Sequence, residues 1–268
     1  MATTPLTIAM SRSTPCRGFA GVRRVGVGLA PLLLLYAFYT AIRFVVAGRG
    51  PVVGERHAGW ILDLERALSL DWELGLQRAT LDHTWLISAA NHYYVYGFLP
   101  VLVTCAVLGA WRATRAFAWW RTAFAVSLAL ALIGYVAFPL APPRLLPAAE
   151  GFVDTLQLYG PRYYGDATGS SLFNAYGSIP SLVNEYAAMP SMHVAWSIVA
   201  GALLFAAFRR RWALAVAIIH PLLMAISVVI TGNHYLLDVV GGIAVLLAAI
   251  ALTPWLGRRG ELSAKLPA

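Results

Sequence analysis

The sequence has few charged side chains: Asp, Glu, Lys and Arg together make up 12% of its 268 residues. A soluble domain carries about a quarter. Hydrophobic residues reach 59%, and the mean hydropathy is +0.68. This scarcity of charge excludes an ordinary soluble enzyme and predicts an integral membrane protein, with enough length for about six spans of roughly 20 residues each.

Cysteine is also scarce, with Cys16 near the N-terminus and Cys105 inside an apolar run. These two are poorly placed to pair, so neither a disulfide nor thiol chemistry is expected. The first 25 residues contain several arginines and no apolar core, so no secretory signal is predicted.

The apolar runs predict an all-α membrane bundle. The six predicted spans are 26–47, 88–111, 119–140, 191–208, 212–231 and 234–256. Residues 1–22 are expected to form a flexible cytoplasmic tail, 23–257 the membrane domain, 141–189 an extracytoplasmic loop, and 258–268 a second cytoplasmic tail.

The segment 48–87 is too polar to cross a membrane. Between residues 55 and 86 it mixes apolar side chains such as Trp60 and Leu64 with charged ones such as Asp63 and Glu65, at helical spacing in its first half. Two interpretations stay open, an amphipathic helix pair in the membrane interface and a packing lid on the bundle. Apolar residues alternate from Leu68 to Leu76, which predicts a break between two helices there.

Charge predicts the orientation. With a cytoplasmic N-terminus, most basic residues fall on the cytoplasmic side, in the tails, around Arg112 to Arg121 and at Arg209-Arg210-Arg211. The positive-inside rule therefore favours six spans, most simply in the plasma membrane, with both termini in the cytoplasm. It also accounts for the net charge of +8 without a nucleic-acid partner.

Two histidines each begin an apolar run on the predicted extracytoplasmic side. His193 ends the motif Pro190-Ser191-Met192-His193, and His234 is followed four residues later by Asp238. On a helix this spacing places Asp238 one turn below His234, where it can fix the imidazole tautomer and leave the other nitrogen as a nucleophile. An ionisable group inside a span indicates function, because burying it is costly.

A phosphate is the substrate group that suits these positions. The predicted helix starts at Ser191 and His234 offer free amide groups, and Arg144 follows a proline-rich exit from the third span. One histidine could attack the phosphate while the other protonates the leaving oxygen. Further candidates for substrate contact are Asn233, His92 and Tyr235, and the loop tyrosines could line a headgroup pocket.

These motifs resemble those of the type-2 phosphatidic acid phosphatase superfamily, Pro-Ser-Gly-His and Ser-Arg-x5-His-x3-Asp, and are most similar to its inositol phosphorylceramide synthase-like branch. The resemblance implies that His234 forms a phosphohistidine, that Asp238 orients it, and that His193 acts as acid and base. Arg144 would match the arginine of the first motif. It implies no metal and no cofactor, and a phospholipid or polyprenyl-phosphate substrate.

Two positions depart from the family pattern: the first-motif lysine is replaced by Ala137 and the third-motif arginine by Val228. The loss of two cations favours the transferase-like branch over simple hydrolysis. Three alternatives stay open: a hydrolytic polyprenyl or phosphatidate phosphatase, a metal enzyme with His193, His234 and Asp238 as ligands, and a non-catalytic transporter or scaffold. The sequence does not predict an oligomeric state.

Overall fold

The computed structural model describes residues 26, 28–30, 37, 50–160 and 186–263. The predicted tail at 1–22, the predicted first span apart from isolated positions, and the loop tyrosines Tyr163, Tyr164 and Tyr176 lie outside the described residues.

The described residues form helices and turns, with no β-strand among them. The helices are α2 (Gly50–Ala67), α3 (Glu73–Leu81), α4 (Thr84–Tyr96), α5 (Leu99–Arg112), α6 (Thr114–Ala137), α7 (Thr155–Tyr159), α10 (Met192–Phe208), α11 (Arg211–Ile230) and α12 (Leu236–Ser263), with short 3-10 turns η2 (Pro143–Leu145) and η3 (Ala148–Glu150). The predicted all-α class is therefore confirmed.

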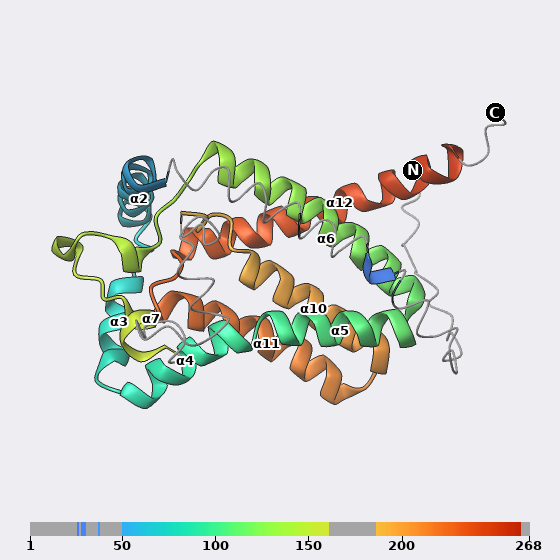
Figure 1. Ribbon diagram of the computed structural model, residues 1–268, viewed down its shortest axis with the longest axis horizontal. Coiled ribbons are helices and arrows are strands. Elements are labelled where there is room, and N and C mark those ends of the chain that lie inside the picture. Colours follow the sequence, from blue (N-terminus) through green and yellow to red (C-terminus); the bar gives the residue numbers. More distant parts are fainter. Residues whose placement is uncertain (1–25, 27, 31–36, 38–49, 161–185, 264–268) are drawn as a thin grey trace.

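Helix α10 is the centre of the bundle. Figure 1 shows α5, α6, α10, α11 and α12 running along the long axis, and α10 packs against all four others. It is apolar on every side, as a buried helix must be. Trp196 is its largest buried side chain and donates from Nε1 to Oγ of Ser127 on α6.

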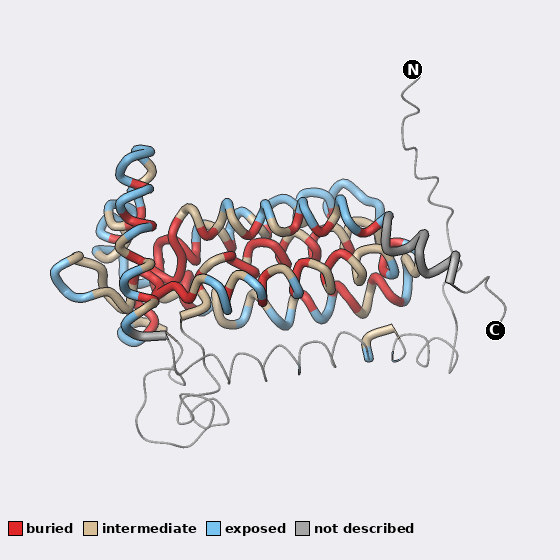
Figure 2. Tube along the Cα trace, turned by 90° about the horizontal axis from the view of Figure 1, so that it is seen from above, coloured by how far each residue is buried: buried red, intermediate tan, exposed pale blue. Residues whose placement is uncertain are grey.

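Helices α2 and α3 cover one end of the bundle, which we call the capped end. Figure 2 shows α2 lying across the bundle axis. Its buried face consists of Ala58, Ile61, Leu62 and Glu65. Its outer face exposes Trp60 and Leu64. The break between α2 and α3 falls at residues 68–72, within the stretch that the alternating pattern predicted.

The prediction of six spans is not confirmed. Within the described part of the chain, three helices are long and apolar enough to cross a membrane, α6, α11 and residues 236–254 of α12. The pair α4 and α5 makes a fourth only if its 44° bend is counted as one span, and α10 is shorter. Helix α12 also runs past the predicted end of the sixth span into the predicted tail. These helices fit an integral membrane protein.

The bend between α4 and α5 has a local cause. Gly97 ends α4, and Pro100 occupies the first turn of α5. Proline has no N–H and disfavours a helical residue before it, so the ladder of hydrogen bonds cannot run through. The bend leaves the aromatic residues of α4 beside the start of α10.

Extended segments on either side of the long loop meet at the capped end. Helix α6 ends at Ala137 because Pro139 follows, and the amide of Leu140 then donates to the carbonyl of Tyr186 at 2.7 Å. The amide of Ala141 donates to the carbonyl of Gly54 in α2 at 3.1 Å. These bonds connect α2 to the loop that carries Arg144.

Candidate active site

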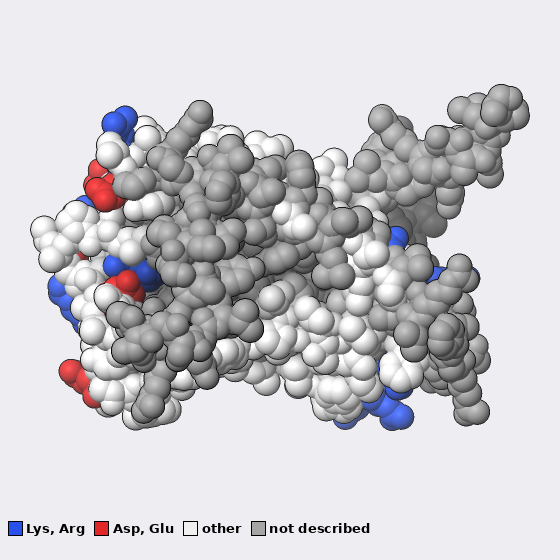
Figure 3. Space-filling view, viewed as in Figure 1, with Lys and Arg blue, Asp and Glu red and all other residues white. Residues whose placement is uncertain are grey.

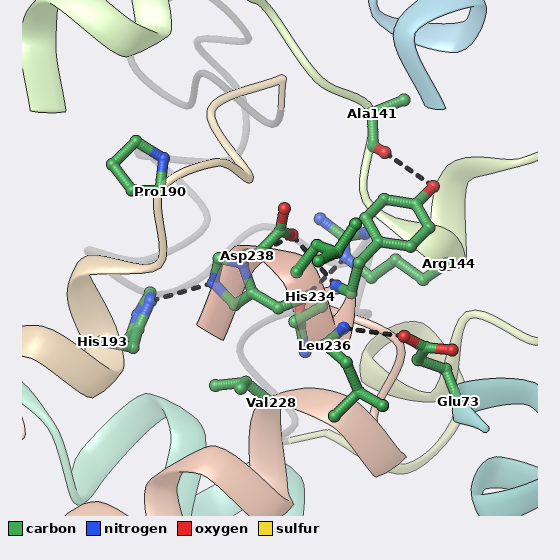
Figure 4. Close-up of polar contacts among 12 residues, drawn as sticks. Glu73, Ala141, Arg144, Pro190, His193, Val228, His234, Leu236 and Asp238 are labelled. Atoms are coloured by element: carbon green, nitrogen blue, oxygen red, sulfur yellow. Dashed lines mark hydrogen bonds and ion pairs between the residues drawn. The ribbon is translucent and has the colours of Figure 1, made fainter. Parts of the chain in front are cut away.

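The two histidines meet at the capped end. Nδ1 of His193 lies 3.4 Å from Nε2 of His234 (Figure 4). His193 stands in the first turn of α10 and is half-buried, and His234 lies in the turn before α12 with only 5% of its surface exposed. Two imidazoles this close can both reach one small substrate group.

Asp238 holds the far side of the His234 ring. Nδ1 of His234 lies 3.2 Å from Oδ2 of Asp238, and the carboxylate is fully buried. A carboxylate accepts, so Nδ1 carries the proton and Nε2 presents its lone pair toward His193. The same Oδ2 accepts the amide of Tyr235 at 3.0 Å, which fixes the carboxylate in turn.

Backbone conformation and backbone hydrogen bonds hold the turn before His234. Gly232 has φ +70°, a conformation that L side chains rarely adopt, and an added Cβ would lie 2.9 Å from Nε2 of Gln77. The amides of Asn233 and His234 both donate to the carbonyl of Val228, at 2.9 and 3.0 Å. Val228 thus supports the nucleophile through its backbone, and its own side chain is fully buried.

Ser191 lies at the start of α10, against α12. Its amide donates to the backbone carbonyl of Asp238 at 2.9 Å. Its Oγ is buried and has no hydrogen-bond partner among the described residues. The amides that follow it in the first turn of α10 have no acceptor within the helix, which makes this helix start suitable for an anion.

Arg144 is held in place by two partners. Its Nε donates to Oδ1 of Asn233 at 3.0 Å, and a terminal nitrogen lies 2.9 Å from Oδ2 of Asp154. Its amide also donates to the carbonyl of Gly232 at 2.9 Å. The guanidinium is therefore fixed beside the residue that precedes His234, and Asp154, which the sequence did not point to, shares its charge.

Two aromatic rings enclose His193. The centroid of Tyr94 lies 4.5 Å from that of His193, and Phe98 lies 4.4 Å away on α5's side of the bend. These contacts restrict the imidazole to one orientation. The sequence had suggested neither ring as a neighbour of His193.

The start of α12 differs from the prediction. The helix begins at Leu236, two residues after His234, and its first amides already have acceptors. Oε1 of Glu73 accepts the amide of Leu236 at 2.7 Å, and Oε1 of Glu65 accepts that of Leu237 at 2.8 Å. The prediction that this helix begins at His234 with free amide groups is therefore wrong. The sequence held one sign of this arrangement that was missed: Glu65 is a charged residue on the apolar face of α2.

The side chains of the remaining two candidates, His92 and Tyr235, form hydrogen bonds with backbone carbonyls. His92 is exposed on α4, and its Nδ1 donates to the carbonyl of Ser88 at 2.8 Å. Tyr235 is fully buried, and its hydroxyl donates to the carbonyl of Ala141 at 3.1 Å (Figure 4). Their roles in substrate contact stay predictions.

The positions of His193, His234 and Asp238 do not suit these residues as ligands of one metal ion. Asp238 bonds Nδ1 of His234 while His193 faces Nε2, so the carboxylate and the second histidine lie on opposite sides of one ring. In the described part of the chain, no group of three or more His, Cys, Asp or Glu residues could hold a metal. The geometry instead resembles a nucleophile with its orienting acid and a second proton carrier.

Comparison with known proteins identifies the family. The family model of the PAP2 superfamily matches residues 59–252, most of the chain and both histidine motifs. The chain therefore belongs to the PAP2 superfamily, whose membership indicates phosphatase or phosphotransferase activity on lipid phosphates. No curated protein and no solved structure matches the chain significantly.

Proposed function

We propose that this protein transfers or hydrolyses the phosphate of a lipid headgroup through a phosphohistidine on His234. The observation that carries the proposal is the placement of His234 between Asp238 on Nδ1 and His193 at Nε2. This is the arrangement of an activated nucleophile: one nitrogen is protonated and oriented, and the other is directed at the place where phosphorus must lie.

The reaction proceeds in two displacements. Nε2 of His234 attacks phosphorus, the bond from phosphorus to the leaving oxygen breaks, and His193 gives that oxygen a proton. Water or an acceptor hydroxyl then attacks the phosphorus, His193 takes its proton, and the nitrogen–phosphorus bond breaks. Near attack needs phosphorus about 3–3.5 Å from Nε2, so a bound phosphate replaces the direct contact of the two rings.

Phosphate is bound by groups on the α10 side and by Arg144. The amides in the first turn of α10 and Oγ of Ser191 supply donors, and Asn233 holds the guanidinium beside the turn. Ala137 and Val228 stand where the family pattern has cations, and Val228 is buried. A site with fewer positive charges favours a diester or pyrophosphate lipid and transfer to an acceptor hydroxyl, as in the inositol phosphorylceramide synthase-like branch. Hydrolysis of a polyprenyl or phosphatidate monoester is the second candidate.

The site is expected on the extracytoplasmic side. Basic residues such as Arg112 and Arg209 lie where α5 and α10 end, opposite the capped end. Figure 3 shows acidic side chains only at the capped end of the face in view, whereas basic ones lie at both ends. An opposite end with basic and no acidic side chains in view supports the charge-based orientation. Cysteine labelling from outside intact cells, at exposed positions of α2, tests it.

Trapping tests the mechanism. The enzyme is incubated with phospholipid labelled on phosphorus, quenched, and assayed for an acid-labile, base-stable adduct that requires His234. The adduct should appear with the native protein and be missing in His234→Ala. Activity that survives in His234→Ala would reject the mechanism, and activity lost to a chelator and restored by a divalent ion would favour the metal alternative.

Product analysis separates the remaining alternatives. Headgroup exchange between two lipids in detergent demonstrates transfer, whereas release of free phosphate alone demonstrates hydrolysis. Vanadate, which mimics the five-coordinate phosphorus, should inhibit either activity. A protein that binds or transports lipid without turnover and without vanadate sensitivity would be a transporter or scaffold.

A further inference from the structure

The first turn of α12 is held by three carboxyl groups in a row. The amides of Tyr235, Leu236 and Leu237 donate to Asp238, Glu73 and Glu65 respectively, at 3.0, 2.7 and 2.8 Å. Asp238 belongs to α12 itself. The other two acceptors come from α3 and α2, more than 160 residues away in the chain.

Glu65 and Glu73 lie side by side in the protein interior. Their exposed fractions are 0% and 1%, and their carboxyl groups accept from the successive amides of Leu237 and Leu236. Oε2 of Glu65 has no partner among the described residues that could donate to it. Two adjacent buried carboxylates cannot both be ionised, and a proton on one of them supplies the missing donor.

We propose that Glu65 and Glu73 are positioning residues that share one proton and hold the start of α12. Helices α2 and α3, which cover the capped end, thereby set the position of His234. The proposal rests on the proposed function of His234 as nucleophile. One residue separates His234 from Leu236, whose amide Glu73 holds. A displacement of about 1 Å at a reacting atom can cost about 10²-fold in rate, so a clamp at this point matters to catalysis.

Sharing one proton also keeps the charge of the site low. The charged and titratable groups facing the pair are Asp238 and Tyr235 from the α12 start. Glu150 from η3 acts on Tyr235 and pairs with Arg66. Arg144 lies beyond Asn233 and is paired with Asp154. Loss of the shared proton would add a negative charge near the site of an anionic substrate and would make the two carboxylates repel each other.

The titration of Glu65 agrees with a bound proton. Burial raises the pKa of the Glu65 carboxyl to about 9, opposed by the amide of Leu237 and reinforced by the charge of Glu73. At neutral pH the pair therefore holds its proton, and it loses the proton on the alkaline side.

The variant Glu65→Gln distinguishes a role of Glu65 in sharing a proton from a role in packing alone. The amide oxygen of glutamine still accepts from Leu237, and its NH2 group donates to an ionised Glu73, which reproduces the proton-sharing state at every pH. We expect near-native kcat at neutral pH. The part of the alkaline decline of kcat/KM that follows loss of the shared proton should be absent in the variant, so that one pH unit above the native midpoint its activity exceeds the native enzyme's about tenfold. An activated aryl phosphate is the substrate, because it depends least on the proton of His193.

The variant Glu73→Ala removes the acceptor of the Leu236 amide. We expect kcat to fall by about 10²-fold or less, with KM little changed, because the substrate contacts remain. The control is Asp63→Asn on the exposed side of α2, which should change neither parameter nor the pH profile. A Glu65→Gln profile that superimposes on the native one, or a Glu73→Ala enzyme with native kcat, would overturn the proposal.

A second readout does not need substrate. Infrared spectra of the native protein in lipid should show a protonated-carboxyl band at neutral pH that disappears at alkaline pH and is missing in Glu65→Gln. The absence of that band in the native protein overturns the shared proton even if lipid phosphatase activity is found. Its presence in a protein without such activity supports the shared proton and rejects only the proposed function.

Discussion

The backbone amide of Ser191 donates to the backbone carbonyl of Asp238 at 2.9 Å. This bond joins the start of α10, which carries His193, to the first turn of α12, which follows His234. It is possible because Gly242 on α12 leaves room for the Ser191 backbone: an added Cβ there would lie 2.2 Å from the Ser191 carbonyl oxygen. The two histidines are therefore set at their distance by backbone contact as well as by side-chain packing.

Gly242→Ala should separate the two helix starts. The new methyl group clashes with backbone, which cannot move aside as a side chain can, so we expect lower thermal stability and loss of most activity. Gly241→Ala is the matched control, because its Cβ would lie 3.7 Å from Met189 and Pro190, an ordinary contact. Alanine is favoured over glycine in a helix by about 1 kcal/mol, so this variant should be as stable as the native protein or more so. Equal effects of the two would contradict the close approach.

His193→Ala should show a rate loss that depends on the leaving group. If His193 protonates the leaving oxygen, a lipid alkoxide should lose about 10²–10⁴-fold, and an activated aryl phosphate much less. Steady-state rates over a series of phosphate esters measure this. A uniform loss across the series would assign His193 a purely structural role.

Asp238→Asn should misorient His234 without unfolding the protein. Asparagine can offer its NH2 group to Nδ1, which reverses the tautomer and places the proton on Nε2, where the lone pair is needed. We expect a large fall in kcat that does not add to the loss in His234→Ala. A double-mutant cycle measures this, and full additivity would argue against a shared role.

Arg144→Lys should weaken phosphate binding. A lysine has no planar fork, so it cannot bond Asn233 and Asp154 at once while facing a phosphate. We expect weaker vanadate inhibition and a higher KM. Arg112→Lys at the opposite end, where the guanidinium bonds the carbonyl of Ala207, is the control and should behave as native. Unchanged vanadate inhibition in Arg144→Lys would exclude this arginine from the phosphate site.

The stability of the protein should decline between about pH 4.5 and about pH 9 through Glu65. The folded state raises the pKa of this carboxyl from 4.5 to about 9, so it holds a proton that the unfolded chain has released. The contribution is greatest below pH 4.5 and is lost as pH rises toward 9. Thermal unfolding in detergent should show a flatter pH dependence for Glu65→Gln. A native slope in that variant would show that Glu65 does not bind the proton.

Much of this protein is determined by local sequence. Long apolar runs predicted the all-α class, and the positions of α6, α11 and α12 follow from them to within a few residues at most ends. The spacing of His234 and Asp238 predicted their contact, which the structure has at 3.2 Å although His234 itself precedes the first residue of α12. Breaks at Pro139 and at residues 68–72 were likewise readable, since proline and a change of periodicity act within a few residues.

Only the tertiary structure decided what lies around the histidines. Glu65 and Glu73 meet the first turn of α12 from more than 160 residues away, and Asp154 shares Arg144 with Asn233. No local pattern encodes such partners, because they depend on how α2, α3 and the loop fold over the capped end. The number of spans is likewise not confirmed by the described residues, because hydropathy does not register the bend at Gly97 or the short length of α10. Local sequence determined that the reactive groups lie at the starts of apolar helices, and long-range packing determined which acceptors hold them.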